Sequence, residues 1–215
     1  MASNDSLERI YRAHHSAKRG EDFALLGDER GAFLASRIGT GKKVLDIGCR
    51  DGALTKSYAE GNDVLGIDID SVALARANER LDIRTEQVDL NGAWGLEEDS
   101  YDAVVACEIV EHLYYPADVF SKIAAVLKPG GMLLGSVPNA FSFANRSRYL
   151  RGSKAGTPLS DPTHINHFTV RELESLLCER FVSVRIVGMG RLGKLASRFP
   201  QAFAFDLCFE ARKPS

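Results

Sequence analysis

The sequence predicts an α/β fold with a mostly parallel seven-stranded sheet, helices on both of its faces and an antiparallel last strand. From residue 43 onward, short apolar runs alternate with helical patterns, which is typical of a parallel sheet covered by helices. The first four of these runs each end at or near a carboxylate. The last two runs, 181–187 and 202–211, can be joined without the helical crossover that parallel neighbours need.

The composition fits one ordinary globular domain. At 215 residues, with 45% hydrophobic and 26% charged residues, the chain can bury a full core. No run approaches the roughly 18 uninterrupted apolar residues that a membrane helix needs. A net charge of -2 does not favour a nucleic-acid backbone as partner. We therefore predict a small-molecule substrate and neither a nucleic acid nor a membrane as partner, with no indication of the oligomeric state.

The four cysteines predict reduced thiols in a cytoplasmic protein. They stand at positions 49, 107, 178 and 208 without CxxC spacing, and the polar first twenty residues are unlike a secretory signal. Cys49 and Cys107 lie at apolar strand ends without an evident activating partner, which favours packing over a nucleophilic role.

The first forty residues predict helical structure. Residues 3–20 form at most a marginal amphipathic helix, and its His14 and His15 are expected at the surface. A second helix is predicted over 28–37, where apolar residues recur at helical spacing before a Gly39-Thr40-Gly41 stop.

Residues 43–90 predict three strand-and-turn units. The strand 43–47 breaks into a turn bounded by Gly48 and Gly52, where the absence of a Cβ lets a ligand lie against the main chain. A helix is predicted over 53–60. The strand 63–67 ends in Asp68-Ile69-Asp70, and Ser71 offers a cap for a helix over 72–81. A third strand, 83–88, ends at Asp89.

The second half of the chain predicts four more strands and a long loop. A strand over 101–107 ends at Glu108, a helix follows over 117–127, and the turn 128–131 precedes a strand over 132–137. Periodicity is then lost for nearly thirty residues, a length typical of functional or mobile loops. Thr169 and Glu172 form a capping box for a helix over 170–179. A glycine-rich, basic segment, 188–200, separates the last two strands.

The strand-end carboxylates indicate a nucleoside site. Ligands of open parallel sheets bind outside the carboxyl ends of the strands. Asp68 suits paired ribose hydroxyls, since a carboxylate accepts two hydrogen bonds, and Asp89 suits an adenine amine. Asp46 is an unfavourable neighbour for a pyrophosphate, and neither GxxxxGK[ST] nor GxGxxG is present. The pocket therefore favours a nucleoside with a positive centre over a dinucleotide.

These motifs resemble those of class I S-adenosylmethionine-dependent methyltransferases. The resemblance runs from about Lys43 to Val137, and more weakly to Ala211, through the segments 44–52, 66–68, 88–90 and 128–131. It implies a Rossmann-like fold, S-adenosylmethionine as cofactor, and a cofactor site made by Asp46, Gly48, Cys49, Gly52, Asp68, Ile69, Asp89, Leu90 and Glu108. Arg50 stands where the family often has glycine, so its side chain is expected to point outward.

The segment Glu108-Ile109-Val110-Glu111-His112 resembles that of ubiquinone-pathway O-methyltransferases and of small-RNA 2'-O-methyltransferases. In the latter, the two glutamates and the histidine hold a divalent metal together with a later histidine, which His164 or His167 would supply here. Alternatively, Glu108 lines the cofactor site and Glu111-His112 orients the next helix. Because spacing does not show that side chains converge, a metal is left open and is not favoured.

Methyl transfer from a sulfonium is an in-line displacement that requires positioning and no covalent nucleophile. His112 and His167 are the candidate bases for an acceptor hydroxyl or amine. The structural alternatives are a helix-start residue bonded to backbone for His167 and a loop residue for His164. Aromatic residues such as Trp94 would stack on an acceptor or anchor loops, and the cations of 146–154 would meet an anionic substrate or form a solvated loop.

The predicted organisation is a single methyltransferase domain with four parts: an N-terminal helical segment (1–42), a cofactor-binding core (43–139), a substrate lid or insertion (140–168) and the C-terminal part of the sheet (169–215). The predicted function is methyl transfer to a small molecule. A catalytically silent module that binds a biosynthetic enzyme is the alternative, because segments 136–139 and 162–169 are similar to methionine-biosynthesis W-type proteins. Intact Asp68 and Asp89 favour a working site. The acceptor is not indicated.

Overall fold

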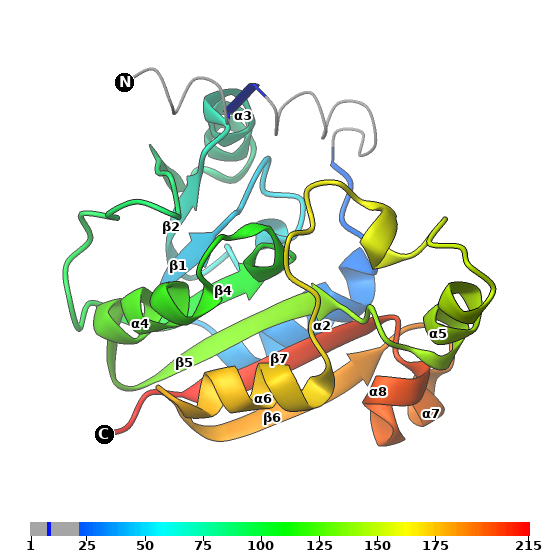
Figure 1. Cartoon of the computed structure of the whole chain (residues 1–215). Coiled ribbons are helices and arrows are strands. Elements are labelled where there is room, and N and C mark those ends of the chain that lie inside the picture. The colour runs from blue at the N-terminus through cyan, green and yellow to red at the C-terminus, as the bar shows by residue number, and fades with distance from the viewer. Residues whose placement is uncertain (1–7, 10–21) are drawn as a thin grey trace. The chain divides into compact units, whose positions relative to one another are not determined.

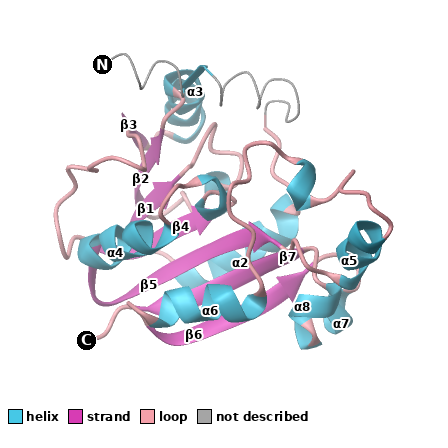
Figure 2. Cartoon of the chain, in the orientation of Figure 1, coloured by secondary structure: helices cyan, strands magenta, loops and turns pink. Residues whose placement is uncertain are grey.

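The computed structural model describes residues 8, 9 and 22–215 (Figure 1). The predicted first helix, with His14 and His15, lies outside the described residues except at positions 8 and 9. Seven strands form one sheet in the order β3-β2-β1-β4-β5-β7-β6, with helices flanking it (Figure 2). The α/β prediction, with its mostly parallel Rossmann-like order and antiparallel end, is confirmed. The chain divides into two compact units at residue 105, and each is described in turn.

The N-terminal unit is built on three parallel pairings. β1 (Lys43–Ile47) pairs with β2 (Asp63–Asp68) on one side and with β4 (Tyr101–Cys107) on the other, and β2 pairs with β3 (Arg84–Gln87). β1 is buried almost throughout, as its continuous apolar run predicts for a central parallel strand. Within residues 22–105 of this unit, the α-helices are α2 (Gly27–Ile38) and α3 (Ser71–Leu81), close to the predicted bounds.

Two local predictions in this unit are wrong. The segment 53–60 is not an α-helix but holds only the 3-10 turn η1 (Thr55–Ser57), because hydroxyls of this segment bond to Asp46 on β1 and Gly61 follows in a left-handed conformation. The cap of α3 is Asp70 rather than Ser71, since the Asp70 carboxylate accepts the N–H groups of Val72 and Ala73.

The C-terminal unit holds the antiparallel end of the sheet. β7 (Asp206–Arg212) pairs antiparallel with both β5 (Leu127–Pro138) and β6 (Val182–Met189). The core of the unit includes an aromatic cluster, in which Phe120 meets Phe181 and Phe209 edge to face with ring centroids 6.4 and 6.3 Å apart. The helices are η2 (Val110–His112), α4 (Pro116–Val126), α5 (Phe143–Leu150), η3 (Pro158–Ser160), α6 (Val170–Cys178), α7 (Gly193–Arg198) and α8 (Pro200–Phe203).

The capping box of Thr169 and Glu172 at the start of α6 is confirmed. Residues 128–131 do not form a turn before β5 but belong to it, since Gly130 and Gly131 bond to the backbone of Pro214 and Lys213. The long loop contains α5 and η3, and the basic segment 188–200 contains α7 and begins α8. Across residues 8, 9 and 22–215, every helix is too short or too polar to cross a membrane.

Candidate active site

The turn after β1 is fixed by backbone bonds to β2. Gly48, Arg50 and Gly52 all have positive φ, at 74°, 52° and 76°. The N–H of Gly48 donates to the Ile67 carbonyl at 2.8 Å, and the N–H of Arg50 donates to Asp68 Oδ2 at 3.0 Å. The left-handed Arg50 is unusual for a residue with a side chain, and its bond to Asp68 offsets that strain.

Asp68, at the end of β2, is a buried carboxylate that holds the backbone of two turns. Its second oxygen, Oδ1, accepts the Asp70 N–H at 2.9 Å, so each carboxylate oxygen holds one backbone amide. Burial raises the pKa of Asp68, and these backbone hydrogen bonds oppose the rise. A carboxylate oxygen can accept two bonds, which leaves both oxygens with capacity for a ligand hydroxyl.

Asp46 is committed to the segment that follows the turn. Its Oδ2 accepts the hydroxyls of Thr55 and Tyr58, both at 2.6 Å. Burial raises the pKa of Asp46 to about 6, against the hydrogen bonds from the two hydroxyls and with a further contribution from the charge of Asp68. Asp46 therefore has a structural task beside any role in holding a ligand.

Two other predicted cofactor residues also have packing roles. A Cβ on Gly52 would lie 2.6 Å from Leu81 Cδ1, so glycine is needed there for contact with α3 as well as for the positive φ. A Cβ on Gly66 would lie only 2.6 Å from Cys49 Sγ, so the glycine leaves room for the Cys49 side chain. Burial, followed by the charges of Asp46 and Asp68, raises the pKa of the Cys49 thiol well above its ordinary value, which supports packing over nucleophilic chemistry.

The loop after β3 holds Asp89 and Leu90. Asp89 is half-buried and its Oδ1 accepts the Asn91 N–H at 2.9 Å. Leu90 is buried, and its carbonyl accepts the indole N–H of Trp94 at 3.1 Å. Trp94 thus anchors this loop, which was one of its two predicted roles. Ile69 is half-buried, and its carbonyl accepts Gln87 Nε2 at 2.9 Å.

The Arg50 side chain is not fully in solvent. Its guanidinium lies 3.4 Å from the Phe23 carbonyl and 4.0 Å from Asp51 Oδ2, and 18% of the side chain is exposed. The outward direction that we expected is therefore modified by contact with the segment before α2.

In the C-terminal unit, Glu108 has the same kind of strained turn as Arg50. Its φ is 53°, its N–H donates to the Ser136 carbonyl at 2.9 Å, and its Oε1 accepts the Ser136 hydroxyl at 3.0 Å. A left-handed non-glycine residue costs on the order of 1–3 kcal/mol, so the neighbouring β5 must hold it. This bonding fixes the direction of the Glu108 side chain.

The buried Glu111 and His112 form a cluster with the half-buried His164. One ligand atom of each lies within 4.8 Å of the others, and Glu111 Oε1 is 3.8 Å from His112 Nε2. The backbone brings them together, because the Glu111 carbonyl accepts the N–H groups of Ile165 and Asn166. The rings of His112 and His164 have centroids 4.8 Å apart, so His164 is part of this cluster rather than a separate loop residue.

The chemistry of the cluster fits a divalent metal. Metals bind imidazole nitrogens and carboxylate oxygens at about 2.0–2.2 Å, so a small closing movement would bring three atoms within 4.8 Å into range. His112 Nδ1 lies 2.9 Å from the Thr163 carbonyl, and a donor there leaves Nε2, the atom nearer Glu111, as the ligand. Glu108 is not a member of this cluster.

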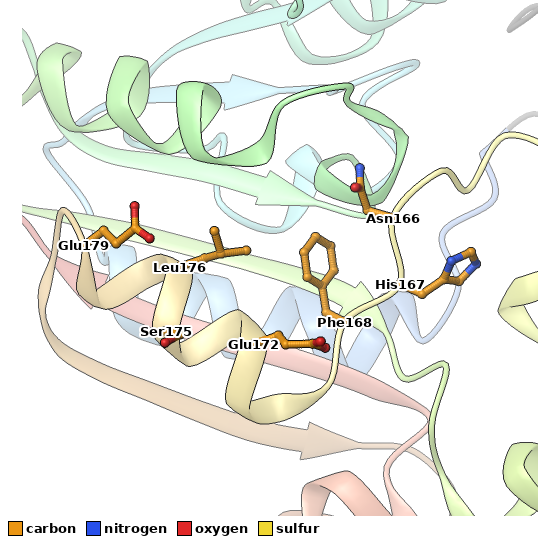
Figure 3. Close-up of a pocket in the computed structure, with 7 residues that line it drawn as sticks. All are labelled: Asn166, His167, Phe168, Glu172, Ser175, Leu176 and Glu179. Carbon is orange, nitrogen blue, oxygen red and sulfur yellow. The ribbon is translucent and has the colours of Figure 1, made fainter.

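His167, the second predicted base, lies next to the cluster. Its ring centroid is 6.5 Å from that of His164. Burial lowers the pKa of His167, and a hydrogen bond with the Pro158 backbone opposes this, so the predicted backbone bond is present. Within the described residues, its Nε2 makes no hydrogen bond. His167 also lines a groove of about 390 Å³ with Asn166, Phe168, Glu172, Ser175, Leu176 and Glu179 (Figure 3).

Asn166 is a positioning residue that the sequence analysis missed. Its side-chain amide donates to the Leu113 carbonyl at 2.6 Å and so ties the segment before α6 to the end of η2. Its place between two histidines was the only sequence signal for this role.

Comparison with known proteins gives a consistent family. A family model described as a methyltransferase domain matches residues 18–181. A ubiquinone biosynthesis O-methyltransferase of Cronobacter sakazakii is 38% identical over 156 residues, which are 65% of this chain and 63% of that relative. Another, of Nitrosococcus oceani, is 34% identical over 114 residues, or 48% of each chain. The chain thus spans about half to two thirds of the length of these curated relatives.

Solved structures share the fold. A SAM-dependent methyltransferase from Archaeoglobus fulgidus matches with a TM-score of 0.69 and 19% identity, covering 94% of this chain and 99% of that one. An S-adenosylmethionine-dependent methyltransferase from Mesorhizobium loti matches with a TM-score of 0.62 and 19% identity, covering 87% and 100%.

Proposed function

Because the chain belongs to the methyltransferase-domain family, we propose that it moves a methyl group from S-adenosylmethionine to a hydroxyl, amine or similar acceptor on a small molecule. The observation that carries this proposal is Asp68, a buried carboxylate at the end of β2 that also holds the glycine turn after β1. A carboxylate so placed suits the ribose diol of a nucleoside.

The other cofactor contacts are assigned along the same strand ends. Asp89 would accept the adenine amine, with Ile69 and Leu90 beside the nucleoside. The turn from Gly48 to Gly52, with Asp46 and Cys49, would hold the methionine part. Glu108, in the C-terminal unit, is a further candidate for cofactor binding. Its left-handed backbone and the hydrogen bond from the Ser136 hydroxyl fix the orientation of its carboxylate.

The acceptor is assigned to the C-terminal unit. His112 and His167 are the candidate bases, His112 only when its Nε2 holds no metal, since its Nδ1 faces the Thr163 carbonyl. The lowered pKa of His167 keeps its imidazole neutral and able to take a proton at neutral pH. Residues 140–168, which include α5 and η3, would select the acceptor as a lid. In-line transfer then depends on how these groups position the acceptor and exclude water.

The decisive experiment is a calorimetric titration of the full chain with S-adenosylhomocysteine, S-adenosylmethionine and NADH. We expect both sulfur nucleosides to bind and NADH not to bind. Asp68→Ala should weaken the binding of S-adenosylhomocysteine by about 1.5–3 kcal/mol, the range for a lost hydrogen bond to a charged group. No heat with either sulfur nucleoside would overturn the proposal.

Asp68 also bonds to the turn, so a control must separate ribose contact from turn geometry. S-adenosylhomocysteine without its ribose 2'-hydroxyl provides that control. If Asp68 contacts the ribose, the wild-type chain should prefer the full ligand and Asp68→Ala should lose that preference. Equal discrimination by both proteins would assign Asp68 to the turn alone.

A silent module that binds a biosynthetic enzyme is the second candidate. The buried Asp68 and the bonded Asp89 turn favour a working nucleoside site over it. Binding of S-adenosylhomocysteine with no methyl transfer to any hydroxyl or amine in a panel of small aromatic acceptors would favour the silent module.

The cluster of Glu111, His112 and His164 is the candidate site for a divalent metal, with these three residues as ligands. A metal bound there would lower the pKa of an acceptor hydroxyl that joined it. The fit rests on the donor set, on atoms within 4.8 Å and on the orientation of His112 by the Thr163 carbonyl. Glu111→Gln and His164→Asn each remove one ligand with little change in volume.

The metal assignment is tested by metal content after dialysis against Zn²⁺ or Mn²⁺ and by the thermal midpoint. We expect about one ion per chain and a rise in the midpoint that Glu111→Gln and His164→Asn abolish. His167→Asn is the matched control, since it removes an imidazole outside the cluster. Equal metal content in all three variants would refute the site.

A further inference from the structure

Three short helices and the residues between them gather at one end of the C-terminal unit. α5, α7 and α8 lie together there (Figure 1). Their contact is aromatic, because the ring of Phe203 on α8 lies 5.4 Å from Phe143 on α5 and 6.4 Å from Phe199, the residue between α7 and α8. These elements therefore present one continuous surface, which we name the α5–α8 face.

Large apolar side chains project from this face into solvent. Leu150 at the end of α5 is 89% exposed, and Phe143, seven residues earlier on the same helix face, is 57% exposed. No residue of α5 is buried except its cap, Ser142. The exposed apolar residues of the α5–α8 face are Phe143, Leu150, Leu192, Leu195, Phe199 and Phe205. A cluster of this kind marks an interaction site in a soluble fold.

The charge around these side chains has one sign. Residues 139–160 contain four Lys or Arg and no Asp or Glu, and residues 181–205 again contain four and none. The whole chain is nearly balanced, with 27 basic and 29 acidic residues, so the excess is local.

The cations of the face are not used for ion pairs within the described residues. Arg146 and Arg151 donate to the backbone carbonyls of Phe141 and Ser147, and Arg198 lies 5.8 Å from the ring of Phe199. Arg191, just before α7, and Lys194, in its first turn, are exposed. The face thus combines protruding apolar groups with positive charge that forms no ion pair among the residues that the structure describes.

We propose that the α5–α8 face binds the surface of an anionic phospholipid bilayer. Leucine and phenylalanine side chains would enter the boundary between head groups and acyl chains, and the cations would meet the phosphates. A nucleic acid would use the cations but gains little from exposed leucines. The sequence predicted no membrane partner because it has no spanning segment, and a surface contact needs none. This proposal does not depend on the proposed catalytic function.

The test is co-sedimentation of the full chain with vesicles of phosphatidylcholine alone or mixed equally with phosphatidylglycerol. We expect binding to the anionic vesicles only, and weaker binding at high salt because the charges are screened. Binding to neither kind of vesicle at low salt would overturn the proposal.

Variants on α7 and its flanks separate the two components, since they lie outside residues 140–168. The triple substitution Arg191→Ala, Lys194→Ala and Arg198→Ala should lower the partition onto anionic vesicles roughly 100-fold. Leu192→Ser with Phe199→Ser should lower it at least about tenfold. The matched control is Arg37→Ala, Lys42→Ala and Arg76→Ala, which removes the same charge from the N-terminal unit and should bind as the wild type does.

Circular dichroism and the affinity for S-adenosylhomocysteine report whether each variant is folded. If the control triple lowers vesicle binding as much as the α7 triple, binding follows net charge and the assignment to this face is wrong. Single-stranded RNA is the competing ligand, and its affinity is measured beside that of the vesicles. If RNA binds more tightly than anionic vesicles, and Leu192→Ser with Phe199→Ser changes neither affinity, the face is a nucleic-acid surface and the proposal fails.

Discussion

At Asp46, the cost of burying a carboxylate is opposed by hydrogen bonds to it. It is buried at the end of β1, where a charge is costly, and two hydroxyls at 2.6 Å partly compensate that cost. Its raised pKa means that the folded state holds the proton more tightly than the unfolded state does. The ionised Asp46 therefore lowers the stability of the folded state at neutral pH, as residues of functional sites often do.

The Asp46→Asn variant should show how much stability the wild type loses when Asp46 ionises. With a folded pKa of about 6 against an ordinary 3.8, the Asp46 contribution to stability is full below pH 3.8 and lost as the pH rises to about 6. The loss is about 3 kcal/mol. The free energy of unfolding of Asp46→Asn, relative to wild type, should therefore rise by this order between pH 4 and pH 7 in urea titrations.

Glu97→Gln, at an exposed position, is the control for the loss of one negative charge. It should not reproduce the trend. A difference between Asp46→Asn and wild type that stays constant from pH 4 to pH 7 would contradict the raised pKa. Weaker binding of S-adenosylhomocysteine by a folded Asp46→Asn variant would add a cofactor role to the structural one.

At the scale of single residues, the sequence predicts acids well and their partners poorly. Asp46 and Asp68 are found because apolar runs end beside them, which is a local pattern. The partners of Asp46, Thr55 and Tyr58, lie on a 3-10 turn that the sequence predicts as an α-helix. His164 meets His112 across 52 positions, and only the fold brings that pair together.

At the scale of the element, the caps of α6 and α3 show where sequence reasoning succeeds and where it fails. The Thr169–Glu172 box is predicted because two residues three positions apart must agree. At α3, Asp70 and Ser71 are both good caps and adjacent, and helix bounds from sequence are uncertain by such a step. The carboxylate of Asp70 is the one that receives two N–H groups.

Alanine substitutions distinguish the two caps. Asp70→Ala should lower the free energy of unfolding by about 1 kcal/mol, because the N–H groups of Val72 and Ala73 lose their acceptor. Ser71→Ala should change it by less than about 0.5 kcal/mol, since the Ser71 side chain is exposed. Urea midpoints measure both, and Asp70→Ser should restore part of the loss. A larger loss from Ser71→Ala than from Asp70→Ala would reverse the assignment.

At the scale of the whole molecule, the sheet is predictable because its strands are buried and its turns are marked. β7 is antiparallel as predicted, but the predicted reason is wrong, because the segment 190–205 before it holds the helices α7 and α8. α5, α7 and α8 are less predictable, because they are only 8, 6 and 4 residues long and turn apolar residues to solvent. The α-helices that the sequence does not predict are those that form the α5–α8 face.

The backbone bonds between Glu111 and residues 165 and 166 have a consequence for how this chain can vary in length. They clamp the far end of the region 140–168, while the Tyr149 hydroxyl clamps its near end on the Ala140 carbonyl at 2.9 Å. Residues 151–156 between these clamps are exposed, and a Cβ at Gly152 or Gly156 would touch nothing within 4 Å. A recognition loop can therefore be inserted between the two glycines, and the buried histidines will keep their places.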